Sequence, residues 1–158
     1  MKAIAIIPYL GYKNAPKAIA WLCNAFGFEE HLVVRGDNGL IVHAELKLDK
    51  VMIMLGSAEH NNESEFSKYL KHPSDIGSCE TQTPYVIMED SYLDEHFAKS
   101  KSCGAKIIIE LRTEDYGGRN YSCADLEGHL WSFGSYNPWT KTTEPEVCNK
   151  SIFQNKYK

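Results

Sequence analysis

Apolar and polar positions along the chain predict a short series of elements that occurs twice. Residues 8–14 and 84–90 are both short apolar stretches, and each closes with a polar residue suited to cap a helix. These two residues, Asn14 and Asp90, are 76 positions apart. Because matched segments at a fixed spacing indicate internal repetition, we expect two copies of one structural unit.

The segment after each capping residue has the spacing of an amphipathic helix. Positions at helical spacing are apolar in both copies: Ile19, Leu22, Cys23 and Phe26 in the first, and Leu93 and Phe97 in the second. Gly27 and Gly104 then end the two patterns with a residue that adopts a left-handed conformation easily. The sequence therefore predicts one helix in each copy, and the second has the weaker apolar stripe.

Each copy closes with a strand-like stretch and a hairpin. The matching segments are 28–34 with a hairpin at 40–55, and 105–111 with a hairpin at 119–133. The order in each copy is β-α-β-β-β, so we predict an α+β fold in which two tandem modules form a curved sheet around a cleft. The predicted boundaries are a single domain at 1–137 (module one 3–56, an inter-module loop 57–82, module two 83–137) and a polar tail at 138–158. We expect the loop to be a lid or a binding loop.

Alternation along the first hairpin predicts which side chains line the cleft. With Asp49-Lys50 as a two-residue turn, the cross-strand pairs Leu48–Val51, Leu46–Ile53 and Ala44–Leu55 are all apolar and should pack against the helix. The opposite side carries His43, Glu45, Met52 and Met54. This mixture of polar and sulfur-bearing side chains predicts a ligand-binding surface.

An offset of 78 residues transfers this pattern to the second hairpin. It places Trp131 and Phe133 in the core, where such large apolar side chains usually lie. The same offset predicts that the cleft side of the second module carries Arg119, Tyr121, Cys123 and Ser132.

Composition narrows the classes of partner. The formal net charge is -4 and the basic residues are scattered, which argues against a nucleic-acid partner. No apolar run approaches the roughly 20 residues that span a bilayer, so we expect no membrane association. The 5 cysteines are widely spaced and form no CxxC pair, which is typical of reduced thiols in a cytoplasmic protein.

Several motifs, in order, resemble one known superfamily. They are Pro8-Tyr9-Leu10, residues 18–28, His43-Ala44-Glu45-Leu46, residues 116–121, and residues 125–134 with their Asp-x-Glu-Gly turn. From residue 3 to about 137 the chain resembles the glyoxalase/bleomycin-resistance/extradiol-dioxygenase (vicinal oxygen chelate) superfamily, in its glyoxalase-like or bleomycin-resistance-like branch.

The resemblance also implies where a metal ion would be held. Enzymes of the superfamily ligate a divalent metal with His and Glu side chains on the first and last strand of each module. The equivalent positions here are Pro8, Met54, Pro84 and Ser132, which are poor ligands for such ions. The resemblance to metal-free members therefore implies no metal cofactor and a homodimer with an aromatic-lined cleft that sequesters a compound.

Three interpretations of function remain open. The first is a metal-free protein that binds a small amphipathic or aromatic compound. The second is a lyase (lactoylglutathione-lyase-like), isomerase or dioxygenase, in which His43 and Glu45 supply a catalytic base or half of a non-standard metal site; alternatively, Glu45 only orients His43. The third is an interaction or regulatory module without small-molecule chemistry.

Overall fold

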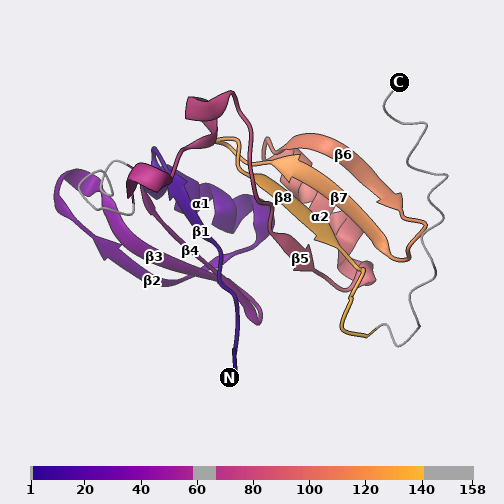
Figure 1. The fold of residues 1–158 in the computed structure, drawn as a ribbon. Helices are drawn as coiled ribbons and strands as arrows, with labels where there is room; N and C mark the ends of the chain where they lie inside the picture. Colours follow the sequence, from indigo (N-terminus) through magenta and orange to yellow (C-terminus); the bar gives the residue numbers. More distant parts are fainter. Residues whose placement is uncertain (1, 59–66, 141–158) are drawn as a thin grey trace.

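Each half of the chain forms a four-stranded sheet with one helix against it (Figure 1). This computed structural model describes residues 2–58 and 67–140. The first module contains β1 (Tyr9–Tyr12), α1 (Ala15–Phe26), β2 (Glu29–Arg35), β3 (Ile41–Leu48) and β4 (Val51–Ser57). The second contains β5 (Tyr85–Ile87), α2 (Asp90–Ser102), β6 (Lys106–Thr113), β7 (Arg119–Ala124) and β8 (Leu130–Gly134). The predicted α+β fold of two tandem β-α-β-β-β modules is confirmed.

The two sheets have equivalent strand orders, β1-β4-β3-β2 and β5-β8-β7-β6. In each sheet the first strand runs parallel to the last strand of its own module. Leu10 lies opposite Leu55 in the first, and Val86 lies opposite Phe133 in the second. These pairs are related by offsets of 76 and 78 residues, as the repeat in the sequence predicts.

Local sequence explains where α1 begins and ends. The side chain of Asn14 accepts a hydrogen bond from the Lys17 backbone N–H at 3.1 Å, and Gly27 closes the helix with φ of 79°. The start of α2 differs from the prediction. Asp90 is the first helical residue rather than the cap, and its carboxylate accepts a hydrogen bond from the Ser135 hydroxyl at 3.0 Å.

The two modules share one core. The Phe26 ring at the end of α1 contacts the rings of Trp131 and Phe133 on β8, with centroids 5.5 and 4.8 Å apart. Both β8 rings are fully buried, which confirms their predicted core position. On the same interface the Trp21 indole N–H donates to the Cys103 carbonyl at 2.9 Å. Neither module therefore completes its core alone.

The described part of the inter-module loop is packed against the fold. It contains two short 3-10 helices, Ser67–Tyr69 and Pro73–Ile76, and the side chains of His72 and Pro73 are buried. Residues 59–66 of the predicted loop and 141–158 of the predicted tail lie outside the described residues. Within residues 2–58 and 67–140, no helix is long and apolar enough to cross a membrane.

A part-buried histidine joins the helices of the two modules. His96 of α2 donates from Nε2 to the Phe26 carbonyl at 3.0 Å, and its Nδ1 lies 2.7 Å from the Tyr121 hydroxyl. Burial lowers the pKa of His96, and the nearby Lys99 lowers it further, although the bond to Phe26 opposes the shift. The neutral imidazole is therefore the form that fits this interface.

We expect His96 to make stability depend on pH. Because its pKa is lower in the folded than in the unfolded protein, its contribution is fully present above the unfolded value of about 6.5 and is lost as the pH falls below it. Urea unfolding at about pH 7.5 and about pH 5.0 should show a larger loss for the wild type than for His96→Gln. His31→Gln, which alters a half-exposed imidazole, should keep the wild-type pH dependence. An equal loss in His96→Gln and the wild type would contradict this assignment.

Candidate functional site

The first hairpin has the predicted register. Leu48 pairs with Val51, Leu46 with Ile53 and Ala44 with Leu55, and the last two pairs are buried against the helix. The side of the sheet away from the helix is called here the open face of its module. In module one the open face carries Tyr9, His43, Glu45, Met52 and Met54, all part-buried or marginally exposed.

Glu45 lies between two imidazoles on this face. Its carboxylate is 3.2 Å from His43 Nε2 and 3.8 Å from His31 Nε2. His31 reaches it because the register of β2 shifts between Glu30 and Leu32, so that His31 is an extra residue in the strand. The sequence singled out His43 and Glu45, but nothing in it marked the irregularity that adds His31.

The predicted face of Tyr121 and Cys123 is wrong. Tyr121 pairs with Phe133 and Cys123 with Trp131, and all four side chains are fully buried on the core side. Burial raises the pKa of both Tyr121 and Cys123, which keeps the phenol and the thiol protonated. These two side chains are part of the shared core and do not reach the open face.

A one-residue difference between the modules causes this error. Ala44 pairs with Leu55, and the equivalent Phe133 pairs with Tyr121, so β3 and β7 are related by an offset of 77 rather than 78. The connection between β7 and β8 is five residues long, 125–129, whereas β3 and β4 are joined by two. A shift of one residue moves every side chain of a strand to the opposite face.

Arg119 is also misplaced by the prediction, for the same reason. Its guanidinium forms a two-point ion pair with Asp94 of α2, at 2.8 and 2.9 Å, and lies 3.6 Å from Asp90. These partners hold the side chain on the helix side of the sheet. Arg119 therefore fastens α2 to β7 and is not an anchor on the open face.

The centre of the open face of module two carries small, polar side chains. Ser132 does lie on this face, where its hydroxyl is 2.8 Å from that of Ser122 on the neighbouring strand. Asn120 and Leu130 share the face by their register with Gly134 and Ala124. On β7, Asn120, Ser122 and Ala124 occupy this face in place of Arg119, Tyr121 and Cys123.

Equivalent tyrosines cover one end of each open face. Tyr9 lies beside Met54 and extends over Gly56, and Tyr85 lies beside Ser132 and extends over Gly134. A Cβ at Gly56 would approach the Tyr9 hydroxyl to 2.8 Å, and one at Gly134 would clash with the Tyr85 hydroxyl. The two glycines thus leave room for the tyrosine hydroxyls close to the sheet. The signal was available in the sequence as two Pro-Tyr pairs 76 residues apart.

Further tyrosines surround Tyr85. Its hydroxyl accepts a hydrogen bond from the Tyr136 backbone, and burial raises its pKa despite that bond. The ring of Tyr136 packs against that of Tyr116 at 5.3 Å, and the Asn120 amide donates to the Tyr116 hydroxyl at 3.0 Å. Module two therefore presents an aromatic cluster at the edge of its open face.

The positions that correspond to metal ligands are neighbours in both modules, as the repeat requires. The Met54 backbone N–H donates to the Pro8 carbonyl at 2.9 Å, and that of Ser132 donates to the Pro84 carbonyl at 3.0 Å. A thioether, a hydroxyl and two prolines do not fit a hard or borderline divalent ion. The described residues contain no group of three or more His, Cys, Asp or Glu side chains that could hold a metal ion.

A groove of about 380 Å³ separates the two modules at the start of their first strands. It is mainly apolar, and its volume is in the range of small-molecule sites. Its lining comprises residues 5–8, Phe28, residues 50–53 and residues 84–86. It touches both open faces, through Met52 of module one and Tyr85 of module two.

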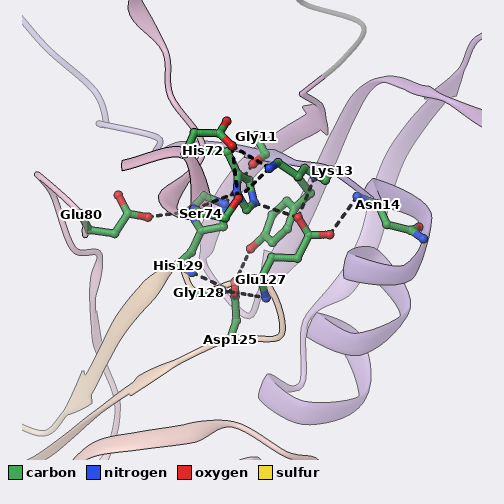
Figure 2. Close-up of polar contacts among 12 residues, drawn as sticks. Gly11, Lys13, Asn14, His72, Ser74, Glu80, Asp125, Glu127, Gly128 and His129 are labelled. Atoms are coloured by element: carbon green, nitrogen blue, oxygen red, sulfur yellow. Dashed lines mark hydrogen bonds and ion pairs between the residues drawn. The ribbon is translucent and has the colours of Figure 1, made fainter. Parts of the chain in front are cut away.

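A buried carboxylate joins the two modules (Figure 2). One carboxylate oxygen of Asp125 accepts hydrogen bonds from the Tyr12 hydroxyl at 2.6 Å and from the Trp131 indole N–H at 3.1 Å. Its other oxygen accepts three backbone N–H groups of the turn, from Glu127, Gly128 and His129. Burial, and then the charge of Asp125, raise the pKa of Tyr12 well above its usual value, so that Tyr12 remains a donor.

The same turn binds the inter-module loop and the start of α1. Glu127 accepts the backbone N–H groups of Lys13 and Asn14 and lies 2.9 Å from His72 of the loop (Figure 2). His129 contacts Glu80 of the loop at 2.6 Å and the Gly11 carbonyl of β1 at 3.0 Å. These contacts fix the loop as structure, so its described part is not a free lid.

The fold, the repeat and the open faces together define the family. The model of the Glyoxalase/Bleomycin resistance protein/Dioxygenase superfamily matches residues 6–133. The chain belongs to this superfamily, as its motifs predicted.

Known proteins similar to the chain agree with this assignment. Uncharacterized protein Rv0887c of Mycobacterium tuberculosis is 28% identical over 131 residues, which are 82% of this chain and 73% of that protein. TioX from Micromonospora sp. ML1 is 29% identical, with a TM-score of 0.62 over 85% of this chain and 100% of TioX. The fosfomycin resistance protein FosX from Listeria monocytogenes, solved with Mn(II) and sulfate, has a TM-score of 0.61 over 87% of this chain and 94% of FosX. Its identity is only 16%, so this likeness concerns the fold alone.

We expect Asp125→Asn to destabilise the protein by roughly 2–4 kcal/mol. The new amide group would point its own N–H donors at the buried N–H of Trp131 and the hydroxyl of Tyr12. Urea unfolding of the variant measures the loss. Asp115→Asn, at an exposed position, should stay within about 0.5 kcal/mol of the wild type. Equal stability of the two variants would show that the Asp125 carboxylate does not hold the modules together.

Proposed function

We propose that the protein binds a small amphipathic or aromatic compound on the open faces of its modules, without a metal ion. The observation that carries this proposal is the pair of equivalent tyrosines, Tyr9 and Tyr85, which lie on these faces beside Met54 and Ser132. Aromatic and apolar side chains with a few polar groups are the usual lining of small-molecule sites.

The open face of module one supports binding of an amphipathic compound. Met52 and Met54 offer flexible, polarisable thioethers that adapt to varied apolar shapes. Beside them, His43 and Glu45 keep side-chain exposures of 33% and 20%, so that polar atoms remain accessible to a ligand. This face combines apolar contact with polar anchors.

The open face of module two supports contact with an aromatic group. The rings of Tyr85, Tyr116 and Tyr136 are gathered at its edge, and Tyr116 is 50% exposed. Exposed tyrosine rings stack on planar groups, and their hydroxyls add hydrogen bonds. The hydroxyls of Ser122 and Ser132 extend the polar part of the face.

The metal-free part of the proposal rests on the chemistry of the available donors. Met54 and Ser132 are poor ligands for the ions that the superfamily uses, and Pro8 and Pro84 offer no side-chain donor. FosX was solved with Mn(II), but its likeness to this chain concerns the fold. A homodimer and a cytoplasmic location remain predictions from the sequence.

A second candidate function is proton transfer to a bound compound. The observation in its favour is the 3.2 Å contact between His43 Nε2 and the Glu45 carboxylate on the open face of module one. A carboxylate that orients an imidazole is a common arrangement for a general base. In that case a ligand identified by binding would also be converted to a product.

We expect a screen of aromatic and glycopeptide-like compounds to yield a ligand whose affinity depends on the open faces. For the best compound, Tyr85→Ala and His43→Ala should each weaken binding by about tenfold or more, because they remove an aromatic contact and a polar anchor. Isothermal titration calorimetry measures both affinities. Tyr92→Ala, which removes an exposed tyrosine on α2, is the matched control and should change the affinity by less than about twofold.

Two results would contradict this assignment of the binding site. One is an affinity unchanged in both Tyr85→Ala and His43→Ala. The other is equal weakening by Tyr92→Ala, which would indicate a site on α2 or a nonspecific effect. Turnover of the compound by the wild type, abolished in Glu45→Gln, would favour the second candidate function.

We expect no divalent ion to bind stoichiometrically. Elemental analysis of the purified protein should find no bound metal. Nickel, zinc, iron, manganese and magnesium ions should each shift the melting temperature by less than about 1 °C, since a ligand stabilises a fold only if it binds the folded state. A bound metal that is lost in His43→Ala would overturn the metal-free proposal and identify His43 as a ligand.

A further inference from the structure

Two histidine–carboxylate pairs fasten the inter-module loop to the turn between β7 and β8. His72 of the loop lies 2.9 Å from Glu127 of the turn, and Glu80 of the loop lies 2.6 Å from His129 (Figure 2). These four side chains are between 4% and 19% exposed. Residues 72–80 are called here the docked segment, because the two pairs hold its first and last residues against module two.

Both ring nitrogens of His129 face hydrogen-bond acceptors. Its Nδ1 lies 2.6 Å from a carboxylate oxygen of Glu80, and its Nε2 lies 3.0 Å from the Gly11 carbonyl. A neutral imidazole carries only one N–H, and neither a carbonyl nor an ionised carboxylate can donate. If His129 were neutral and Glu80 ionised, one of the two contacts would therefore have no proton. The geometry requires one added proton in this pair, which makes His129 an imidazolium beside an ionised Glu80.

His72 has the opposite requirement. Its Nδ1 accepts a hydrogen bond from the Ser74 backbone N–H at 3.2 Å, so this nitrogen carries no proton. Its Nε2 then donates to Glu127 at 2.9 Å, and the ring is neutral. The ring centroids of His72 and His129 are 5.4 Å apart, a distance at which two positive charges would repel each other. The two neighbouring rings thus hold one added proton between them, on the side of His129.

The charges around His129 favour this proton. The titratable groups that surround the ring come from three segments: Glu80 and His72 of the docked segment, Asp125 and Glu127 of the turn, and Tyr12 of β1. Tyr12 stays neutral because burial, and then the charge of Asp125, raise its pKa. The nearby base Lys13 is paired with Asp75 at 2.7 Å. Three carboxylates thus remain around the ring, and their negative charge stabilises an added proton.

We propose that this added proton is a pH-sensitive fastening: when the pair of His129 and Glu80 loses it, the docked segment detaches while the two sheets stay folded. Without the proton, either Glu80 or the Gly11 carbonyl keeps no donor, and an acceptor left unpaired in a buried place is costly. Glu80 is the more exposed partner and belongs to the loop, so its release into water relieves this cost.

The sheets do not depend on the same proton. The Asp125 carboxylate joins the modules through Tyr12, Trp131 and three backbone N–H groups, and none of these donors is an imidazole. His96, at the interface of the two helices, responds to pH in the opposite direction, since its neutral form fits that interface. A rise in pH therefore strengthens the contact at His96 while it releases the docked segment.

Hydrogen exchange of the full chain tests this proposal. The backbone N–H groups of Asp75 and Ser78 bond within the docked segment, to the carbonyls of His72 and Pro73. Their protection factors, corrected for the intrinsic exchange rate, should fall by about tenfold between about pH 6 and about pH 8.5. The amides of β3 and β4 should keep their protection over the same range.

Two matched variants separate the added proton from other effects of pH. In Glu80→Gln the new amide can donate to Nδ1 of a neutral His129, whose Nε2 still donates to Gly11, so no added proton is needed. Its docked segment should therefore change protection by less than about twofold over the same pH range. The control Glu110→Gln removes an exposed carboxylate that pairs with Lys101 at 3.0 Å, and it should keep the wild-type dependence.

Nitrogen-15 spectra of the histidine rings observe the proton itself. At about pH 6 the His129 ring should be an imidazolium in the wild type and neutral in Glu80→Gln. A neutral His129 ring beside an ionised Glu80 in the wild type would overturn the proposal. So would constant protection of the docked segment, an equal fall in Glu80→Gln, or a simultaneous loss of protection in β3 and β4. None of these measurements uses a ligand, so this proposal and the proposed function can fail separately.

Discussion

The buried carboxylate of Asp125 is the interaction on which the arrangement of this molecule depends. It binds the hydroxyl of Tyr12 in module one and the indole of Trp131 in module two, and it holds the turn between β7 and β8 with three backbone hydrogen bonds. A buried charge is tolerated only when hydrogen bonds satisfy it, and here five donors do so. The same turn presents Glu127 to the start of α1 and His129 to β1, so one short segment fixes both modules and the loop between them.

The length of that turn also decides what the second open face contains. Because five residues connect β7 to β8, the offset from β3 to β7 is 77 residues, whereas the offset from β4 to β8 is 78. This difference of one residue reverses the faces of β7. Tyr121 and Cys123 consequently point into the core, and Asn120 and Ser122 take their place outside. The superfamily fold is thus retained, but its two open faces are chemically different: one carries histidines, a glutamate and methionines, and the other serines and tyrosines.

The sequence was sufficient for the fold and for half of the candidate site. Periodicity, capping residues and hairpin alternation predicted every strand and helix of the repeat, because each of these signals is local. The first open face followed from the two-residue turn at Asp49-Lys50, which leaves only one register. The second did not, since the register across a longer turn depends on how Asp125 folds the backbone. His31 was missed because a strand bulge has no reliable signal in a single sequence, and the tyrosines over Gly56 and Gly134 depend on contacts between strands.

Binding of a small molecule on the open faces can be observed directly through the methionine methyl groups. Met52 and Met54 lie on the open face of module one, whereas Met88 packs against the shared core. In a protein labelled with carbon-13 at its methionine methyls, nuclear magnetic resonance spectra recorded with a bound aromatic compound should show shifts for Met52 and Met54 and none for Met88. A compound that binds with the same affinity while shifting only Met88, or no methionine at all, would show that it does not bind on the open face of module one.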